Sequence, residues 1–180
     1  MNYNFNKDIQ EIIARLRKDK ISFEDKTVLV TGGAGFLGSW LCDVLIEQNA
    51  YCICLDNLSS GLFNNILHLK DKETFRFINH DISYPIYFGM SYHPLGICVG
   101  DIKRIDIVMH LASRASPFEF KDNPISILRS NTLGTLNTLG IAKHHNATYF
   151  YTSTSEVYGN PPREAVPTPE SYFGHVNPVG

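Results

Sequence analysis

The sequence predicts an α/β fold built on a doubly wound parallel sheet. Five short apolar segments rich in β-branched residues are predicted to be strands, at 27–31, 51–55, 74–78, 105–110 and 148–152. Helical patterns separate most of them, above all at 38–48 and 124–145. Three glycines follow the first strand, at the start of the first of these helices. Strands that alternate with helices in this way pair in parallel.

Residues 7–18, which precede the first strand, have the spacing of an amphipathic helix. Ile9, Ile12, Ile13 and Leu16 recur at helical intervals, with charged residues between them. We expect this helix to pack on its own domain rather than on a partner protein. Residues 1–24 are therefore predicted to be an N-terminal helix and its linker.

The first predicted strand runs into a turn with three glycines, Gly32, Gly35 and Gly38, spaced G-x-x-G-x-x-G. A strand, a glycine turn and a helix N-terminus together form a site for a pyrophosphate, because backbone N–H groups and the positive end of the helix dipole face the anion. Gly32 allows the tight turn, Gly35 lets the backbone approach the phosphate, and Gly38 lets the helix pack against the strand.

A carboxylate follows the second predicted strand at the spacing that a dinucleotide requires. Asp56 lies 18 residues after Gly38, where a carboxylate accepts hydrogen bonds from the adenosine ribose hydroxyls. An acid there repels a 2′-phosphate, so NAD is favoured over NADP. The alternative is a plain βαβ unit with a capping aspartate. Residues 25–180 are predicted to be one NAD-binding domain of the Rossmann type.

Two later strands end in residues that suit a ligand site. Leu111, Ala112 and Ser113 follow the fourth strand, and the carboxyl ends of such strands border the ligand in open α/β sheets. Hydroxyls and one carboxylate follow the fifth strand, in Thr154-Ser155-Glu156, where they can bond a reacting alcohol or move a proton. The alternative is a turn whose hydroxyls bond local backbone. Residues 84–104 are predicted to be an irregular excursion.

Composition excludes several classes of partner. The chain has 180 residues and a net charge of -2, which favours neither nucleic acid nor an anionic membrane. No window approaches 18 apolar residues. The four cysteines form no C-x-x-C pair and the histidines have no metal-ligand spacing, so we expect reduced core thiols in a cytoplasmic protein and no metal.

Several motifs together resemble the extended short-chain dehydrogenase/reductase family. They are T-G-G-A-G-F-L-G, D-N-L-S-S-G, H-L-A-S, N-T-L-G-T-L-N and S-T-S-E-V-Y-G-N-P. Within that family, H-L-A-S-x-A-S-P, S-T-S-E-V-Y-G and Y-F-G-H-V-N-P-V-G are similar to the UDP-glucuronic acid decarboxylases. The resemblance covers residues 26–180 apart from the excursion.

The resemblance implies a redox-neutral decarboxylation. NAD⁺ oxidises C4 of UDP-glucuronate, the resulting β-keto acid loses CO₂, and hydride returns to give UDP-xylose. By position, Thr154 matches the hydroxyl that bonds the C4 oxygen, and Glu156 matches its acidic partner. Ser155 stands where the dTDP-glucose 4,6-dehydratases have an aspartic acid that protonates the departing hydroxyl. Serine cannot do this at neutral pH, so dehydration is disfavoured, whereas a 4-epimerase stays possible.

The same resemblance assigns the binding residues and a partner. The implied cofactor residues are Gly32, Gly35, Phe36, Leu37, Gly38, Asp56, Asn57, Ser59, Ser60, Gly61, Asp81, Ile82, Leu111, Ala112, Ser113 and Thr132. The implied substrate residues are Ser116, Arg129 and Asn177. The family usually dimerises through helices, so a homodimer is expected, with 124–145 as one of the helices.

The family's base is a Tyr-x-x-x-Lys pair expected shortly after Y-F-G-H-V-N-P-V-G. The only such spacing here is Tyr3 to Lys7, before the first strand. The last residues also have the composition of folded protein. We therefore expect a truncated chain or fragment that is inactive by itself. A non-catalytic NAD-binding module is the alternative from another class.

Overall fold

The computed structural model describes residues 5–114, 116 and 119–176. Its main sheet has five strands, which the sequence predicted to within two residues. They are β1 (Thr27–Thr31), β2 (Tyr51–Asp56), β3 (Phe75–Asn79), β6 (Ile107–His110) and β7 (Thr148–Tyr151). Their order is β3-β2-β1-β6-β7, and β1 pairs in parallel with both β2 and β6. The predicted parallel α/β architecture is therefore confirmed.

The helices predicted at 7–18, 38–48 and 124–145 are present, and the short α3 (Glu119–Asp122) is one that periodicity did not predict. The others are α1 (Phe5–Lys18), α2 (Phe36–Glu47), α4 (Pro124–Arg129) and α5 (Thr135–His145). A π-helical turn, η3 (Ser130–Gly134), joins α4 to α5, so that 124–145 forms one helical rod with an irregular centre. Such turns displace side chains from the regular helical positions.

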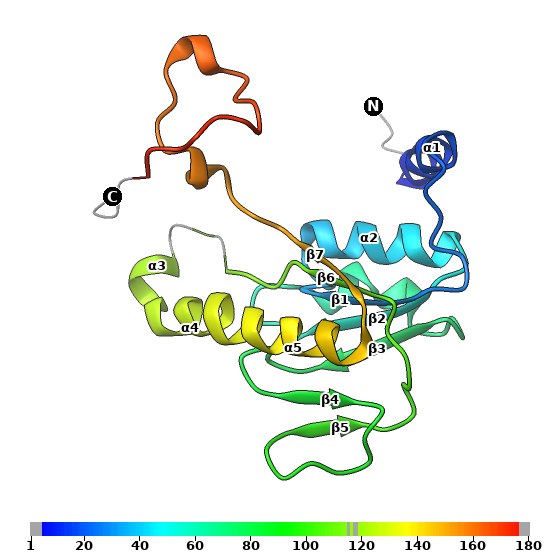
Figure 1. Cartoon of the computed structure of the whole chain (residues 1–180). Coiled ribbons are helices and arrows are strands. Elements are labelled where there is room, and N and C mark those ends of the chain that lie inside the picture. The colour runs from blue at the N-terminus through cyan, green and yellow to red at the C-terminus, as the bar shows by residue number, and fades with distance from the viewer. Residues whose placement is uncertain (1–4, 115, 117–118, 177–180) are drawn as a thin grey trace. The chain divides into compact units, whose positions relative to one another are not determined.

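The sheet is covered on both faces (Figure 1). Val28 and Val30 of β1 share one apolar cluster with Cys42 and Leu45 of α2. The alternate residue, Leu29, belongs to the cluster on the other face, which includes residues of α5. Successive side chains of a strand point to opposite faces, so the apolar β1 run supplies both cores.

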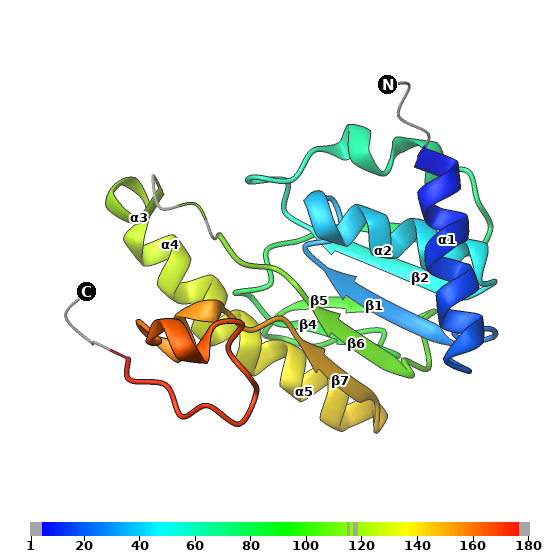
Figure 2. The same ribbon diagram turned by 90° about the horizontal axis from the view of Figure 1, so that it is seen from above.

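Helix α1 forms an outer layer on α2 (Figure 2). Ile9 and Ile13 are buried against Val44, and the rings of Phe5 and Trp40 lie 4.5 Å apart between centroids. The predicted amphipathic helix thus packs on its own domain, because its apolar stripe meets one on the outer side of α2.

The structure corrects the prediction for 84–104, which is not wholly irregular. Strands β4 (Ile86–Phe88) and β5 (Ile97–Val99) pair in parallel as a separate two-stranded sheet. Phe88 and Val99 are buried with Leu29, on the face that α5 also covers. The two strands have only three residues each, too few for an alternating pattern to reveal them.

The chain divides into two units, residues 1–150 and 151–180. The main sheet up to Phe150, all five helices and the two-stranded sheet belong to the first. The second contains the short 3₁₀ turns η4 (Ser155–Tyr158) and η5 (Arg163–Ala165), and a bridge between Gly159 and His175.

Two helical glycines allow a matched test of packing. A Cβ on Gly38 would overlap the backbone of Gly32, whereas a Cβ on Gly140 would meet nothing within 4 Å. We expect Gly38→Ala to lower the free energy of unfolding by about 1–3 kcal/mol, as overpacking does. Gly140→Ala should raise it by about 0.5–1 kcal/mol through helix propensity. Urea unfolding measures both; equal effects would contradict the packing described.

Candidate functional site

The turn between β1 and α2 brings three backbone segments together. Gly32 has a φ of +71°, and a Cβ on it would lie 2.9 Å from Cα and N of Ala112, in the loop after β6. Gly38 contacts the backbone of Gly32, so α2 approaches β1 closely. Gly32 thus makes the tight turn, and Gly38 lets the helix pack, because neither has a side chain.

The start of α2 is open to an anion. Gly35 precedes the helix in an extended conformation, and a Cβ on it would meet only the Gly32 carbonyl oxygen within 4 Å. Phe36 and Leu37 are exposed, and no acidic residue lies in the first helical turn. Backbone N–H groups and the positive dipole end therefore meet no carboxylate there, which fits a pyrophosphate.

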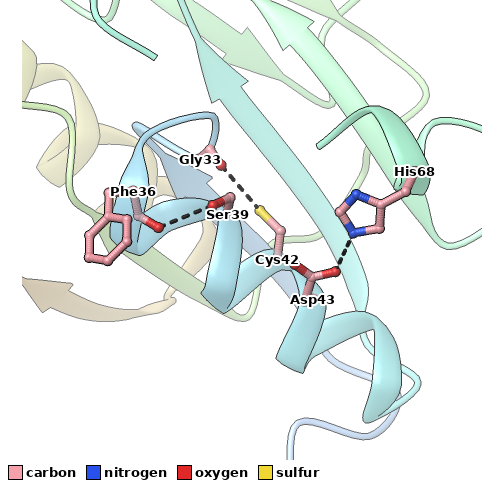
Figure 3. A network of polar contacts seen from close by, with 6 residues as sticks. All are labelled: Gly33, Phe36, Ser39, Cys42, Asp43 and His68. Carbon is pink, nitrogen blue, oxygen red and sulfur yellow. Dashed lines mark hydrogen bonds and ion pairs between the residues drawn. The ribbon is translucent and has the colours of Figure 1, made fainter. Parts of the chain in front are cut away.

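Polar contacts hold α2 in place behind this turn (Figure 3). Ser39 Oγ donates to the Phe36 carbonyl at 3.1 Å, and Cys42 Sγ lies 3.8 Å from the Gly33 carbonyl oxygen. Farther along, Asp43 Oδ1 lies 2.6 Å from Nε2 of His68. Burial raises the pKa of Asp43, and His68 acts in the opposite direction. Side chains thus bind α2 both to its own turn and to the segment after β2.

Asp56 lies beside the glycine turn at the end of β2. Its side chain accepts hydrogen bonds from the N–H groups of Ala34, at 3.0 Å, and Leu58, at 2.8 Å. The residue is only 8% exposed. Since a carboxylate has about four acceptor positions, two bonds leave capacity for ribose hydroxyls. Tertiary structure therefore joins Asp56 to the turn, as the 18-residue spacing led us to expect.

The loop after Asp56 folds back over the same turn. Asn57 Oδ1 accepts from the Ser59 N–H at 3.0 Å, and Gly61 lies against Ala34. Asn57, Ser59 and Ser60 are exposed. Asn65, which sequence reasoning missed, donates from Nδ2 to the Ala34 carbonyl at 2.9 Å. Asparagine is common in loops, so nothing local marked it.

Asp81 and Ile82 lie after β3, at the same edge of the sheet. Ile82 is buried against Gly134, and its carbonyl accepts from Asn137 Nδ2 at 2.8 Å. Burial raises the pKa of Asp81, but hydrogen bonds from Ser83 outweigh it and hold that pKa below its ordinary value. Asp81 is thus ionised at neutral pH.

An open cavity of about 470 Å³ lies beside Asp81. Tyr84 and Arg129 line it together with the start of α4, and the Arg129 guanidinium lies 4.9 Å from the centre of the Tyr84 ring. Arg129, which we expected among the substrate residues, therefore lies near Asp81, a residue expected near the cofactor.

The loop after β6 contacts both the glycine turn and the helical rod. The Leu111 N–H donates to the Thr31 carbonyl at 3.1 Å, and the Ala112 N–H donates to Thr31 Oγ1 at 3.4 Å. Ser113 Oγ donates to Asn131 Oδ1 at 2.9 Å. Asn131 is a second residue that the sequence prediction missed, although it belongs to the quoted motif N-T-L-G-T-L-N.

Thr132, expected at the cofactor, and Ser116, expected at the substrate, form hydrogen bonds with residues that are near them in the sequence. Thr132 Oγ1 donates to the Leu128 carbonyl at 2.6 Å, within the rod. Ser116 is half-buried, and its carbonyl accepts from the Glu119 N–H at 3.0 Å.

A buried histidine, His110, lies behind the loop at the end of β6. Its Nδ1 is 2.7 Å from Thr31 Oγ1 and its Nε2 is 3.3 Å from Thr135 Oγ1. Burial lowers the pKa of His110 to about 4. Sequence reasoning missed this residue, and the signal that could have found it was its position at the end of an apolar strand.

The candidate catalytic residues belong to the second unit. Thr154 precedes η4, and its Oγ1 accepts from the Glu156 N–H at 3.3 Å. Thr154, Ser155 and Glu156 are all exposed. As an acceptor in this local bond, the Thr154 hydroxyl keeps its own proton to donate elsewhere. Asn177 lies outside the described residues.

In the part of the chain that the structure describes, no three His, Cys, Asp or Glu side chains could hold a metal ion. Across those same residues, no helix is long and apolar enough to span a bilayer.

The family model of the NAD dependent epimerase/dehydratase family matches residues 28–179. UDP-glucuronic acid decarboxylase 1 of Xenopus tropicalis is 39% identical over 191 residues, which cover 97% of this chain and 41% of that protein. Its Danio rerio namesake is 43% identical over 155 residues, which cover 86% of this chain and 33% of that protein. The chain therefore spans well under half the length of these relatives.

A solved structure shares the fold. UDP-N-acetylglucosamine 4-epimerase from Methanobrevibacter ruminantium M1, in complex with UDP-N-acetylmuramic acid, superimposes with a TM-score of 0.67 at 31% identity. The match covers 85% of this chain and 45% of that one. With a family model that matches most of its residues, this chain belongs to the NAD dependent epimerase/dehydratase family.

Proposed function

We propose that this chain is the NAD-binding part of a UDP-glucuronate decarboxylase. The observation that carries the proposal is the meeting of the glycine turn, Asp56 and the loop after β6 at one edge of the sheet. Residues 25–180 form the NAD-binding domain, and residues 1–24 form its N-terminal helix and linker. Sequence similarity to decarboxylases supports the choice of reaction.

The proposal assigns each part of the dinucleotide to a segment around the turn. The start of α2, with Gly35, Phe36 and Leu37, holds the pyrophosphate. Asp56 binds the adenosine ribose, helped by the loop of Asn57, Ser59, Ser60 and Gly61. Adenine lies at the edge formed by Asp81 and Ile82. The rest of the NAD molecule is bordered by Leu111, Ala112, Ser113 and Thr132. A carboxylate at Asp56 disfavours the 2′-phosphate of NADP.

When bound, NAD⁺ supplies reversible oxidation at C4 of the sugar. The Thr154 hydroxyl bonds the C4 oxygen, and Glu156 supports the proton transfers around it. Ser155 cannot supply the acid that elimination of water requires at neutral pH. Loss of CO₂ from the 4-keto acid needs no such acid, because the ketone accepts the electrons. These residue types therefore favour decarboxylation over dehydration.

The substrate proposed is a UDP-sugar, UDP-glucuronate in the first place. Ser116 and Asn177 are assigned to it by their positions in the family motifs. Arg129 is assigned with them, although its contact with Tyr84 lies beside Asp81 and suits the cofactor end equally well. The four free cysteines, three of them buried, support a reducing compartment such as the cytoplasm.

We also propose a homodimer formed through the rod of 124–145. Its exposed large apolar side chains, which we call the apolar stripe, are Ile125, Leu128, Leu133, Leu136 and Leu139. Ile125 is 73% exposed and Leu136 is 64% exposed. Contiguous exposed apolar side chains mark interaction surfaces, and the family resemblance favours a second copy as the partner.

Replacing Asp56 tests the cofactor. Asp56→Asn removes a charge-assisted acceptor for the ribose, so the Kd for NAD should rise about tenfold. Asp71→Asn, at an exposed site, should leave it unchanged. Titration calorimetry with NAD and NADP measures both variants and the wild-type chain. Equal affinity of Asp56→Asn and wild type, or tighter binding of NADP by the wild type, would contradict the assignment.

The reaction is tested on the complete gene product that contains these residues. With NAD⁺ and UDP-glucuronate we expect release of CO₂ and formation of UDP-xylose. Thr154→Val should lower kcat by about 100-fold or more, whereas Thr154→Ser should retain most activity. A 4-epimer without CO₂ would replace the decarboxylase with an epimerase, and NAD binding without turnover would favour a binding module.

The 180-residue chain by itself should bind NAD and form no product, because Tyr3 to Lys7 is its only Tyr-x-x-x-Lys spacing. Product formation by this chain alone would refute that expectation.

The dimer is tested by a charge in the apolar stripe. Leu136→Glu should convert the dimer to a monomer, because burying an unpaired carboxylate is costly. Leu95→Glu is the matched control, since Leu95 is 72% exposed and lies on the segment between β4 and β5. Light scattering after size exclusion measures the mass. A monomeric wild type, or a dimer that survives Leu136→Glu alone, rules out this surface.

A further inference from the structure

His110 joins three segments behind the proposed cofactor edge. It is the last residue of β6, is 2% exposed, and pairs in register with Thr31 at the end of β1. One ring nitrogen faces Thr31 and the other faces Thr135, at the start of α5. The ring is therefore placed between the strand that enters the glycine turn and the helical rod.

The neighbouring groups determine where the ring carries its proton. Thr135 Oγ1 donates to the Asn131 carbonyl at 2.8 Å, because a carbonyl can only accept. Its oxygen must then accept from an N–H at His110 Nε2. On the other side, the Ala112 N–H donates to Thr31 Oγ1, which leaves the Thr31 proton for Nδ1. Of the two neutral forms of the ring, only the one with its proton on Nε2 satisfies all four of these hydrogen bonds.

This chain of hydrogen bonds ends at groups that border the proposed site. One end is the N–H of Ala112, whose backbone lies against Gly32. The other is the carbonyl of Asn131, whose side chain accepts from Ser113. The π-helical turn η3 contains Asn131 and leads directly into Thr135. The ring thus connects the two residues that bond the loop 111–113, which are Thr31 at the end of β1 and, through Thr135, Asn131 in η3.

We propose that His110 is a positioning residue, which acts as an uncharged ring protonated on Nε2 to hold the loop 111–113 between the glycine turn and η3. This role rests on the proposed function, since the loop borders the cofactor only if NAD binds at this edge. His110 itself touches no reacting atom. A second proton on Nδ1 would face Thr31 Oγ1, which already accepts from Ala112 and would lose the acceptor for its own proton.

The surroundings keep the ring uncharged at physiological pH. Among the groups packed against it are threonine hydroxyls from β1 and α5, the backbone of Gly134 in η3, and the ring of Tyr149 from β7, whose centroid lies 6.3 Å from that of His110. Burial is the cause that lowers the pKa of His110 to about 4. Because this pKa lies below the ordinary value near 6.5, the native protein gains stability as pH rises between these values.

The protonation state is tested by NMR on the ¹⁵N-labelled 180-residue chain. Long-range ¹H–¹⁵N spectra distinguish the two neutral forms and the charged ring, and His110→Asn identifies the signals. We expect a neutral ring with its proton on Nε2 at pH 7 and half-protonation near pH 4. A proton on Nδ1, or a charged ring at pH 7, would overturn the proposal.

Positioning is tested with two variants of Thr31, one that lacks the hydroxyl and one that keeps it. Thr31→Val leaves His110 Nδ1 and the Ala112 N–H without their partner, so the Kd for NAD should rise about tenfold. Thr31→Ser keeps the hydroxyl and should stay within about twofold of wild type. Both are measured where circular dichroism shows folded protein. A purely structural role would lower stability but leave the Kd of folded Thr31→Val unchanged, and that result would overturn the proposal.

Hydrogen exchange at the Ala112 amide separates this failure from failure of the proposed function. If the wild-type chain binds no NAD, the cofactor assignment fails and the exchange rate alone decides the positioning role. Faster exchange in Thr31→Val than in Thr31→Ser would support the hydrogen-bonded chain. Equal rates in the two variants would contradict it.

Discussion

The candidate site depends on the close approach of three backbone segments at Gly32. The turn after β1, the first turn of α2 and the loop after β6 meet there at distances that leave no room for a Cβ. Backbone that approaches so closely must still satisfy its polar groups, since an unpaired buried N–H or carbonyl is costly. Asp56, Asn65 and Thr31 provide the partners, each from a different part of the chain. The glycines leave room for this close approach of the backbone segments. The polar side chains around them satisfy the backbone groups that the approach buries.

Charge is distributed unevenly around this turn. The start of α2 has no acidic side chain, whereas Asp56 and Asp81 lie at the ends of β2 and β3. A dinucleotide has the complementary arrangement, with its negative charge in the pyrophosphate and hydroxyl donors on the ribose. Behind the loop after β6, burial lowers the pKa of His110 to about 4, so that this ring adds no charge at neutral pH. This distribution of charge suits a diphosphate at one position and hydroxyl groups at another, as the proposed function requires.

The chemistry proposed for the second unit depends on residue types more than on a preformed arrangement. Thr154, Ser155 and Glu156 lie in one exposed turn, where the threonine hydroxyl has a backbone partner and a proton to donate. A serine between the other two excludes a strong acid from that position at neutral pH. The relatives named as decarboxylases and the superimposed 4-epimerase share the family but differ in reaction. The choice between them rests on which bond breaks after C4 is oxidised, and product analysis decides it.

Much of the fold and part of the site could be predicted from sequence because their signals are local. Apolar runs located the five main strands, and the spacing from Gly38 to Asp56 predicted a carboxylate next to the glycine turn. Strands β4 and β5 escaped prediction, since three residues are too few to show a period. Asn65, Asn131 and His110 were missed because their partners, Ala34, Ser113 and Thr31, lie 18 to 79 residues away.

The sequence by itself determined the α/β class, the pyrophosphate-type turn and the residue types available for catalysis. Only the tertiary structure decided that Arg129 lies over Tyr84, that α1 covers α2, and that a buried histidine connects β1 with the helical rod. The physical reason is that backbone periodicity and turn chemistry act between near neighbours in the chain, whereas burial and hydrogen-bond pairing depend on which distant segments meet.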